Sequence, residues 1–470
     1  MPNKYLQTTG INTYINPLLQ DGQLIHCNNF VSFPFGAKTK RAGFSISGTV
    51  GSGTINAIWN FPRADGTTYY AQLGSLVYYS NTGFSSIGTI VTNGTVSATT
   101  VVGRAFLGDT MILGDGVNPT RHSTNGGTFV DTTLAPIAKH FEQYQNRIYA
   151  MGTASTLFYS TTNDATNWNT SGTSDSSSFT VPGAGRGGKI FKTADQLIIP
   201  KTSGLMYKWD GYQLIDLSTN YGPQAQYSIA KSEDYYFYVN SLGINGYGGD
   251  KPKLLSNSIQ RQFYSDGTSG VFNNSGYNLG TIISECYRYD YISSVGTITD
   301  GFVNRTLTNG IIKYDFQKNE FLNWSLGTAP TAFFTDLTGA GQELYYGDRS
   351  GKIWRYDKDA HADNTGVSIP CELIMVFHYG EPEFEKTWHW FRGIFNPGCE
   401  ARVQVSCSDT YTYTGLKWQD LGDCTSGVVE YKFSGERTSK FLFVRIYESS
   451  TVSRTTYYGC SIDAEVNYKR

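Results

Sequence analysis

A short β-strand pattern recurs along most of this chain at intervals of about forty to sixty residues. Each recurrence has a strand, a turn rich in Gly, Asp, Ser and Thr, and a second strand that ends in an aromatic or apolar cluster. The closing strands are clearest at residues 76–79, 157–159, 205–209, 311–314 and 353–356, with weaker candidates at 119–123 and 254–258. A degenerate repeat of this size, built from short strands, is typical of β-propeller blades. We therefore expect a stiff disc that acts through its faces, its channel and its partners.

The composition agrees with an all-β fold. The chain has 470 residues, of which 39% are hydrophobic and 15% aromatic, enough to bury a large core in more than one domain. It contains 34 Tyr and 52 Gly but only 5 Met. Aromatic side chains suit the pleated surface of a sheet and Gly suits tight turns, so this balance favours strands and turns over helices.

Three regions are predicted. Residues 1–50 form an extended lead-in with little periodicity, which could wrap or close a neighbouring element, and residues 51–369 form the propeller. The propeller has six or seven blades, some of them irregular, because the segment 219–310 departs from the repeat and the lead-in could complete one blade. Residues 370–470 contain seven longer alternating strands, which predict a C-terminal β-sandwich. The polar segments 161–188 and 265–281 are expected to be long surface loops.

Charge and cysteine content exclude some classes of protein. The chain carries 37 basic and 39 acidic residues, a net charge of -2, whereas a freely diffusing nucleic-acid binder needs a cationic excess. The N-terminus has no secretory pattern and no apolar run is long enough to span a bilayer, so no membrane insertion is expected. The 7 Cys form no C-x-x-C pair, which favours buried free thiols, with a disulfide among the C-terminal ones left open.

The search for chemistry predicts no catalytic residue, no metal site and no cofactor, and hence a protein that is not an enzyme. The 6 His are scattered, and no nucleophile elbow or phosphate loop is present. Residues 161–168 resemble the Asp-box turn of sialidase-like propellers, where that turn is structural. A glycosidase would also need two carboxylates facing one pocket, and the sequence singles out no such pair.

One basic cluster is a candidate site. Lys38, Lys40 and Arg41 lie close together near the end of the lead-in. They could face phosphates along a DNA channel, since Lys and Arg contact the DNA backbone without reading its sequence. The alternative is an ordinary solvated loop.

Short motifs at both ends of the chain resemble tailed-phage virion proteins in which a propeller is followed by a sandwich. At the N-terminal end they are Gly10-Ile11-Asn12-Thr13, Asn16-Pro17-Leu18, Asp21-Gly22-Gln23-Leu24, Cys27-Asn28-Asn29-Phe30 and Lys40-Arg41-Ala42-Gly43-Phe44. At the C-terminal end they are Val403-Gln404-Val405-Ser406, Ser408-Asp409, Trp418-Gln419-Asp420-Leu421-Gly422 and residues 461–466.

The resemblance implies a structural component of a short-tailed phage: a tail nozzle, hub or packaged-DNA stabilisation protein. In that family the copies form a ring, typically a hexamer, below the portal and head-to-tail adaptor. The ring helps close the DNA channel and carries fibres or spikes. The resemblance thus implies a protein of the virion tail, assembled in the host cytoplasm, that contacts genomic DNA only transiently. A net charge near zero fits DNA that is retained and then released. The alternatives are a carbohydrate- or receptor-binding propeller and a glycoside hydrolase.

Overall fold

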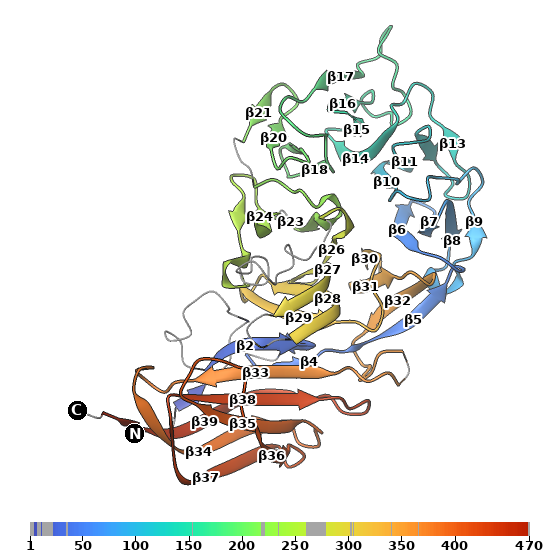
Figure 1. Ribbon diagram of the computed structural model, residues 1–470. Coiled ribbons are helices and arrows are strands. Elements are labelled where there is room, and N and C mark those ends of the chain that lie inside the picture. Colours follow the sequence, from blue (N-terminus) through green and yellow to red (C-terminus); the bar gives the residue numbers. More distant parts are fainter. Residues whose placement is uncertain are drawn as a thin grey trace.

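The computed structural model describes residues 4–6, 11, 22–33, 36–152, 154–217, 221–233, 235–259, 279–300, 303, 305–339, 341–364 and 366–468. Within these ranges the chain is built from β-strands and four short 3-10 helices, η2 (Phe84–Ser86), η3 (Gln226–Ser228), η4 (Ser256–Ile259) and η5 (Leu279–Thr281). Seven sheets stand in a ring and a layered sandwich lies against one side of that ring (Figure 1). The protein is therefore a β-propeller with an attached β-sandwich.

Five consecutive blades each consist of four antiparallel strands that follow one another along the chain. They are β6 (Ile55–Arg63), β7 (Gly66–Leu73), β8 (Leu76–Ser80) and β9 (Thr89–Ile90); β10 (Gly103–Leu107), β11 (Thr110–Gly114), β12 (Arg121–Ser123) and β13 (Val130–Asp131); β14 (Ala138–Tyr144), β15 (Arg147–Gly152), β16 (Thr156–Tyr159) and β17 (Ser177–Thr180); β18 (Phe191–Lys192), β19 (Leu197–Pro200), β20 (Met206–Trp209) and β21 (Leu214–Asp216); and β22 (Ala230–Ser232), β23 (Tyr235–Asn240), β24 (Gly243–Tyr247) and β25 (Lys253–Leu254).

The sixth blade keeps this order but its sheet continues beyond the propeller, and the seventh blade departs from the order. The sixth blade is β26 (Ile283–Tyr287), β27 (Asp290–Asp300), β28 (Arg305–Asp315) and β29 (Glu320–Ser325). The seventh is β30 (Ala332–Asp336), β31 (Glu343–Gly347) and β32 (Lys352–Asp357), and its outermost strand is β5 (Gly43–Thr49) from the N-terminal region. The described residues thus form seven blades, and the lead-in completes one of them.

The turns that reverse the strands follow from local chemistry. Between β14 and β15, Tyr144 pairs with Arg147 across a two-residue turn in which Gln145 has φ 47° and Asn146 has φ 56°. Two positive φ values are the mark of a type I′ turn, whose twist matches that of antiparallel strands. This turn returns the chain outward from the centre of the propeller.

The sandwich consists of two sheets, and the N-terminal region contributes to both. One sheet contains β2 (Gln23–Asn28), β33 (Cys371–Phe377), β38 (Phe441–Glu448), β35 (Arg402–Ser408) and β36 (Gln419–Asp423). The other contains β3 (Phe30–Ser32), β4 (Lys38–Lys40), β39 (Thr456–Asn467), β34 (Glu385–Phe395) and β37 (Val428–Ser439), with β1 (Lys4–Leu6) paired to β39. Both faces of β38 are buried, as its apolar residues at successive positions predict.

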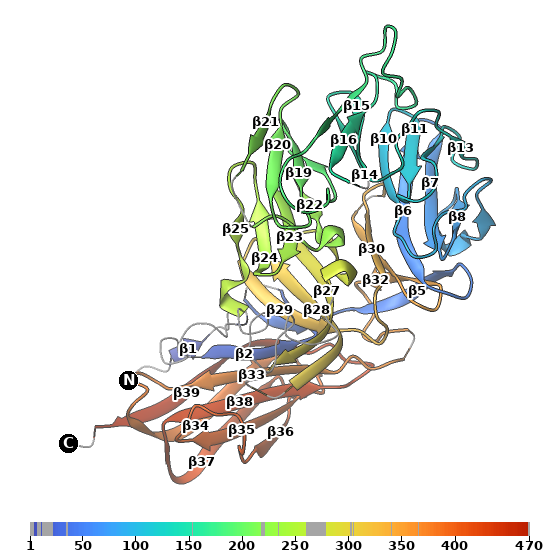
Figure 2. The same cartoon turned by 45° about the horizontal axis from the view of Figure 1, so that its top comes forward.

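Strand β2 joins the propeller to the sandwich. It pairs in antiparallel fashion with β33 on one side and in parallel with β29 of the sixth blade on the other, at Asn28 and Asn323. The sixth blade and one sandwich sheet therefore form a single nine-stranded sheet. Figures 1 and 2 show β2 between the two bodies from two directions.

Most predicted closing strands are found as third strands of blades, but one predicted closing strand and one predicted loop are wrong. Residues 254–258 do not form a third strand, because the third strand of the fifth blade is β24. In β24 the position of Gly246, which packs against the ring of Tyr235, has no side chain, so the strand lacks the aromatic or apolar cluster that marks the other third strands. The segment 161–188 is not one loop, since it contains β17, a strand of Ser and Thr with one Phe. Residues 265–278, and residues 10, 12–13, 16–18 and 21 of the N-terminal motifs, lie outside the described residues.

Candidate functional site

The basic cluster is not a surface patch. Lys38, Lys40 and Arg41 are 0%, 0% and 1% exposed, so the structure contradicts both the DNA-channel prediction and the solvated loop. Each of the three instead forms a buried ion pair with a residue distant in sequence. A buried charge needs such a partner because leaving water without one costs several kcal/mol or more.

The two lysines connect β4 to the propeller and to the sandwich. The Lys38 Nζ donates to Glu320 Oε2 at 3.0 Å at the start of β29, and to Ser32 Oγ at 2.7 Å. The Lys40 Nζ lies 3.1 Å from Glu448 Oε1 at the end of β38 and donates to two backbone carbonyls of the following loop. Lys38 therefore binds the N-terminal region to the sixth blade, and Lys40 binds it to the sandwich.

Arg41 makes the largest number of hydrogen bonds of the three. Its guanidinium donates two bonds to Asp363, at 3.0 Å to Oδ1 and 2.7 Å to Oδ2. The remaining bonds go to Asn29 Oδ1 at 2.9 Å, the Ala42 carbonyl at 2.9 Å and the Ser325 carbonyl at 3.1 Å. All five N–H donors that an arginine carries are therefore used.

The residues after Arg41 explain the rest of the Lys-Arg-Ala-Gly-Phe motif. A Cβ on Gly43 would lie 1.9 Å from the carbonyl oxygen of Ala362, so only glycine fits. Phe44 is buried and meets the ring of Tyr346 edge-on at 4.9 Å. The motif that resembles phage proteins thus encodes a packed joint between the seventh blade and the N-terminal region.

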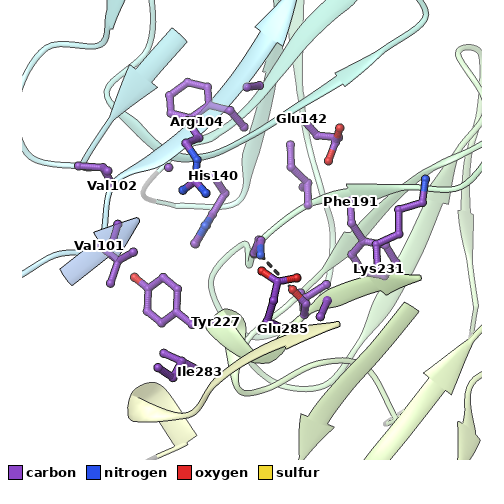
Figure 3. A pocket seen from close by; sticks show the side chains of 18 of the residues that line it. Val101, Val102, Arg104, His140, Glu142, Phe191, Tyr227, Lys231, Ile283 and Glu285 are labelled. Carbon is purple, nitrogen blue, oxygen red and sulfur yellow. Dashed lines mark hydrogen bonds between the residues drawn. The ribbon is translucent and has the colours of Figure 1, made fainter. Parts of the chain in front are cut away.

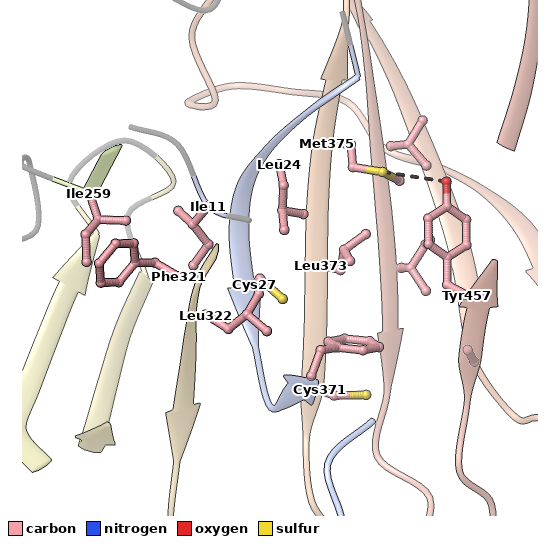
Figure 4. Packing of buried hydrophobic residues seen from close by; sticks show 14 of the residues in the cluster. Ile11, Leu24, Cys27, Ile259, Phe321, Leu322, Cys371, Leu373, Met375 and Tyr457 are labelled. Atoms are coloured by element: carbon pink, nitrogen blue, oxygen red, sulfur yellow. Dashed lines mark hydrogen bonds between the residues drawn. The ribbon is translucent and has the colours of Figure 1, made fainter. Parts of the chain in front are cut away.

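Apolar residues and a second ion-pair group complete the joint. A continuous cluster runs from Phe321 and Leu322 of the sixth blade through Leu24 and Cys27 to Leu373 of the sandwich. Figure 4 shows the N-terminal residues lying between the two bodies. At the edge, Arg305 of β28 donates two bonds to Glu372 of β33, at 3.0 and 3.1 Å, and Arg445 donates to the same carboxylate. We call this region, from β2 to Phe44 with its partners, the junction.

The second candidate site is the propeller channel. The innermost strand of each blade is its first, and successive first strands such as β10 and β14, or β26 and β30, are in contact around the centre. Residues from all seven first strands line a cavity of about 510 Å³. In Figure 3, Arg104 and Glu285 extend into this space from opposite sides.

Charged side chains are concentrated in this channel. Five cations line it, Arg104, Lys139, Lys189, Lys192 and Lys231, against the two carboxylates Glu142 and Glu285. The cavity therefore carries a formal charge of +3 inside a chain whose net charge is -2.

Burial changes the ionisation of several of these groups. Burial lowers the pKa of Arg104 to about 10 and raises the pKa of Glu285 to about 7. The pKa of His140 falls to about 3 through burial and the nearby charges of Lys139 and Lys189, so this imidazole is neutral. Burial also lowers the pKa of Lys189, with the charge of Arg104 as the next cause.

The sequence missed the channel because the repeat is marked by apolar third strands, whereas the charges lie on or next to the first strands. The sequence of the first strands nevertheless contains a pattern that indicates a charged channel. The first strands β10, β14, β18, β22 and β26 each combine apolar residues with an Arg, Lys or Glu.

Other motifs have structural roles in the described residues. The Asp-box-like segment is a turn in which Asp164 accepts a bond from the Thr166 N–H and the indole N–H of Trp168 donates to the Ala165 carbonyl at 2.9 Å. The seven cysteines, all within the described residues, form no disulfide bond. Within the described ranges, no three His, Cys, Asp or Glu side chains come together as metal ligands. No helix in those ranges is long and apolar enough to cross a membrane.

Neither a family model nor a curated protein sequence matches the chain. Solved structures that are similar include the YCF48 protein of Cyanidioschyzon merolae, at 10% identity and a TM-score of 0.43, covering 67% of this chain and 98% of that one. BamB from Moraxella catarrhalis has 10% identity and a TM-score of 0.38, covering 76% of this chain and 99% of that one. The designed protein Ika8 has 11% identity and a TM-score of 0.39, with coverages of 66% and 99%.

The chain is thus a β-propeller protein, an assignment that rests on its strand pairing. None of the three similar structures is a phage tail protein, and at these identities and TM-scores they carry no argument about function.

Proposed function

We propose that this chain is a structural component of a phage tail that acts by assembly rather than by catalysis. In this proposal it is a nozzle or hub subunit, built into a ring that helps close the DNA channel and anchors fibres or spikes. Its partners are further copies of itself, hexameric by the family resemblance, and the adaptor or portal-side proteins above the ring. It would be made in the host cytoplasm and reside in the virion tail.

The observation that carries the proposal is the junction. The propeller and the sandwich share one nine-stranded sheet and one apolar cluster, and buried ion pairs connect β4 to each of them. A ligand-binding propeller has no need of this coupling, because its binding site lies within one body. A subunit that transmits force between an adaptor and a fibre needs its two bodies to move as one.

The sequence resemblance supports the same proposal at the same place. The Lys-Arg-Ala-Gly-Phe motif forms the ion pairs, the close backbone contact and the aromatic packing of the junction. The resemblance to tail proteins therefore falls on residues that hold the architecture together.

The first test is the oligomeric state of the purified full chain, measured by native mass spectrometry and negative-stain electron microscopy. We expect closed rings. An antibody raised against the chain should then label the tails of phage particles that encode it. A chain that stays monomeric at all concentrations and labels no particle would contradict the proposal.

Two further assays separate the alternatives. A carbohydrate-binding propeller should be retained on a glycan array as an isolated monomer, and a glycoside hydrolase should release reducing sugars from polysaccharides. Either result, together with the absence of rings, would replace the proposal.

Arg41→Met should weaken ring formation by loosening the junction, whereas Arg402→Met, which removes an exposed ion pair with Asp420, should not.

A further inference from the structure

We propose that the channel of the propeller is a binding site for a small organic polyphosphate, a molecule with two or more phosphate groups. This inference does not depend on the proposed assembly role. It rests on how the cations of the channel are placed, compared with the three buried cations of the junction.

At the junction, buried cations are neutralised at close range. Lys38, Lys40 and Arg41 have carboxylate oxygens at 3.0, 3.1 and 2.7 Å. In the channel, among the described residues, only Lys192 has a carboxylate oxygen within 4.0 Å, at 3.9 Å from Glu142. Within the described part of the chain, four of the five channel cations therefore lack the close carboxylate partner that each of the three junction cations has.

The channel cations are instead held by neutral groups. Arg104 lies over the ring of Trp59 at 5.1 Å, Lys139 lies over the ring of Tyr227 at 5.1 Å, and the Lys189 Nζ donates to the Ile229 carbonyl at 3.1 Å. These contacts orient the side chains without cancelling their charge. Burial lowers the pKa of Lys189, and the positive charge of Arg104 lowers it further; a bound anion would counteract both effects.

The size and lining of the cavity select a small ligand. A volume of about 510 Å³ lies within the range of about 300–1,000 Å³ that holds cofactor-sized molecules. Arginine can bind a phosphate with two parallel hydrogen bonds, and lysine interacts with it as a point charge. A ligand with several phosphates therefore pairs with the five channel cations better than a ligand with one. The aromatic side chains of the lining offer surface to the organic part of the ligand; they are Phe106, Phe141, Phe191, Tyr227, Tyr236 and Phe333.

The carboxylates are compatible with a phosphate ligand. Since the pKa of Glu285 is raised to about 7, near neutral pH this group is partly a neutral acid and can donate a hydrogen bond to a phosphate oxygen. Glu142 is offset by the positive charges of Lys192, Lys189 and Lys231.

The test is calorimetric titration of the full chain at low ionic strength with tripolyphosphate, ATP and inositol hexakisphosphate, and with citrate and a short single-stranded DNA as comparison anions. We expect saturable one-to-one binding of the polyphosphates, at least tenfold tighter than that of citrate or the DNA. Arg104→Gln and Lys189→Gln should each weaken it at least tenfold. Lys253→Gln, on the outer strand of the fifth blade, is the matched control and should leave binding unchanged.

Folding of the variants is checked by circular dichroism. If Arg104→Gln or Lys189→Gln fails to fold, Lys231→Glu serves instead, because this side chain is exposed at the channel and its change disturbs no core. The inference is overturned if no polyphosphate binds at millimolar concentration, if the channel variants bind as the wild type does, or if the DNA binds more tightly. Ring formation is measured separately, so either idea can fail alone.

Discussion

Replacing Arg41 by methionine tests whether the buried ion pairs hold the junction together. The variant leaves the Asp363 carboxylate, which is 13% exposed, without its two hydrogen bonds from the guanidinium. The carbonyls of Ala42 and Ser325 lose a donor as well. Removing one partner of a buried pair costs about 3–5 kcal/mol, and methionine fills most of the volume, so little of this cost comes from a cavity.

The assay is urea unfolding followed by tryptophan fluorescence. With an m-value of about 3 kcal/mol/M, the expected loss lowers the unfolding midpoint by about 1 to 1.7 M. Trp324 and Trp388 are buried on opposite sides of the junction, in the sixth blade and the sandwich, so the signal reports on both bodies.

The chain provides a matched control. Arg402 forms an ion pair with Asp420 at the same 2.7 Å, but its side chain is 52% exposed. Because exposed pairs contribute about 0–1 kcal/mol, Arg402→Met should barely move the midpoint. The double variant Arg41→Met with Asp363→Asn should cost less than the sum of the single changes by about 1 to 3 kcal/mol. Equal effects of Arg41→Met and Arg402→Met would refute the reasoning.

Three other predictions concern single residues. Because folded Glu285 keeps its proton up to about pH 7 and the unfolded chain releases it near 4.5, this group destabilises the fold progressively as pH rises between those values. The free energy of unfolding of Glu285→Gln should therefore rise relative to wild type between about pH 5 and pH 8 in parallel urea titrations, and a constant difference would refute the assignment. Gly43→Ala should lower stability by about 1–3 kcal/mol because its Cβ meets the Ala362 carbonyl, whereas Gly327→Ala, with open space at its Cβ, should be near neutral in the same assay. Burial raises the pKa of Cys27 to about 12, so mass spectrometry should find it unalkylated by iodoacetamide in the native protein and alkylated in urea.

Local patterns in the sequence predict the blades well. Third strands such as β8, β20 and β32 carry aromatic and apolar residues at short spacing, and the Asp210-Gly211 turn lies between β20 and β21 as expected. The strands of the sandwich follow their alternating pattern in the same way. These features depend on neighbours in sequence, which a single chain displays directly.

Long-range pairing is what the sequence conceals. The partners of Lys38, Lys40 and Arg41 lie 282, 408 and 322 residues away, so a basic cluster that is buried in the fold has the same local sequence as an exposed one. The channel is hidden for the same reason, since Arg104 and Glu285 line one cavity only when the ring closes.

Closure of the seventh blade by β5 sets the order of events during synthesis. Strand β5 leaves the ribosome early, but β32, with which it pairs from Gly43–Asp357 to Thr49–Lys352, is about 300 residues later in the chain. At about 5–20 residues per second, β5 waits about 15–60 s with an unpaired edge while the other blades are made. Such an edge readily pairs with the wrong strand, including one from another nascent copy. Mispairing at this edge should therefore compete with closure of the propeller until β32 has been made.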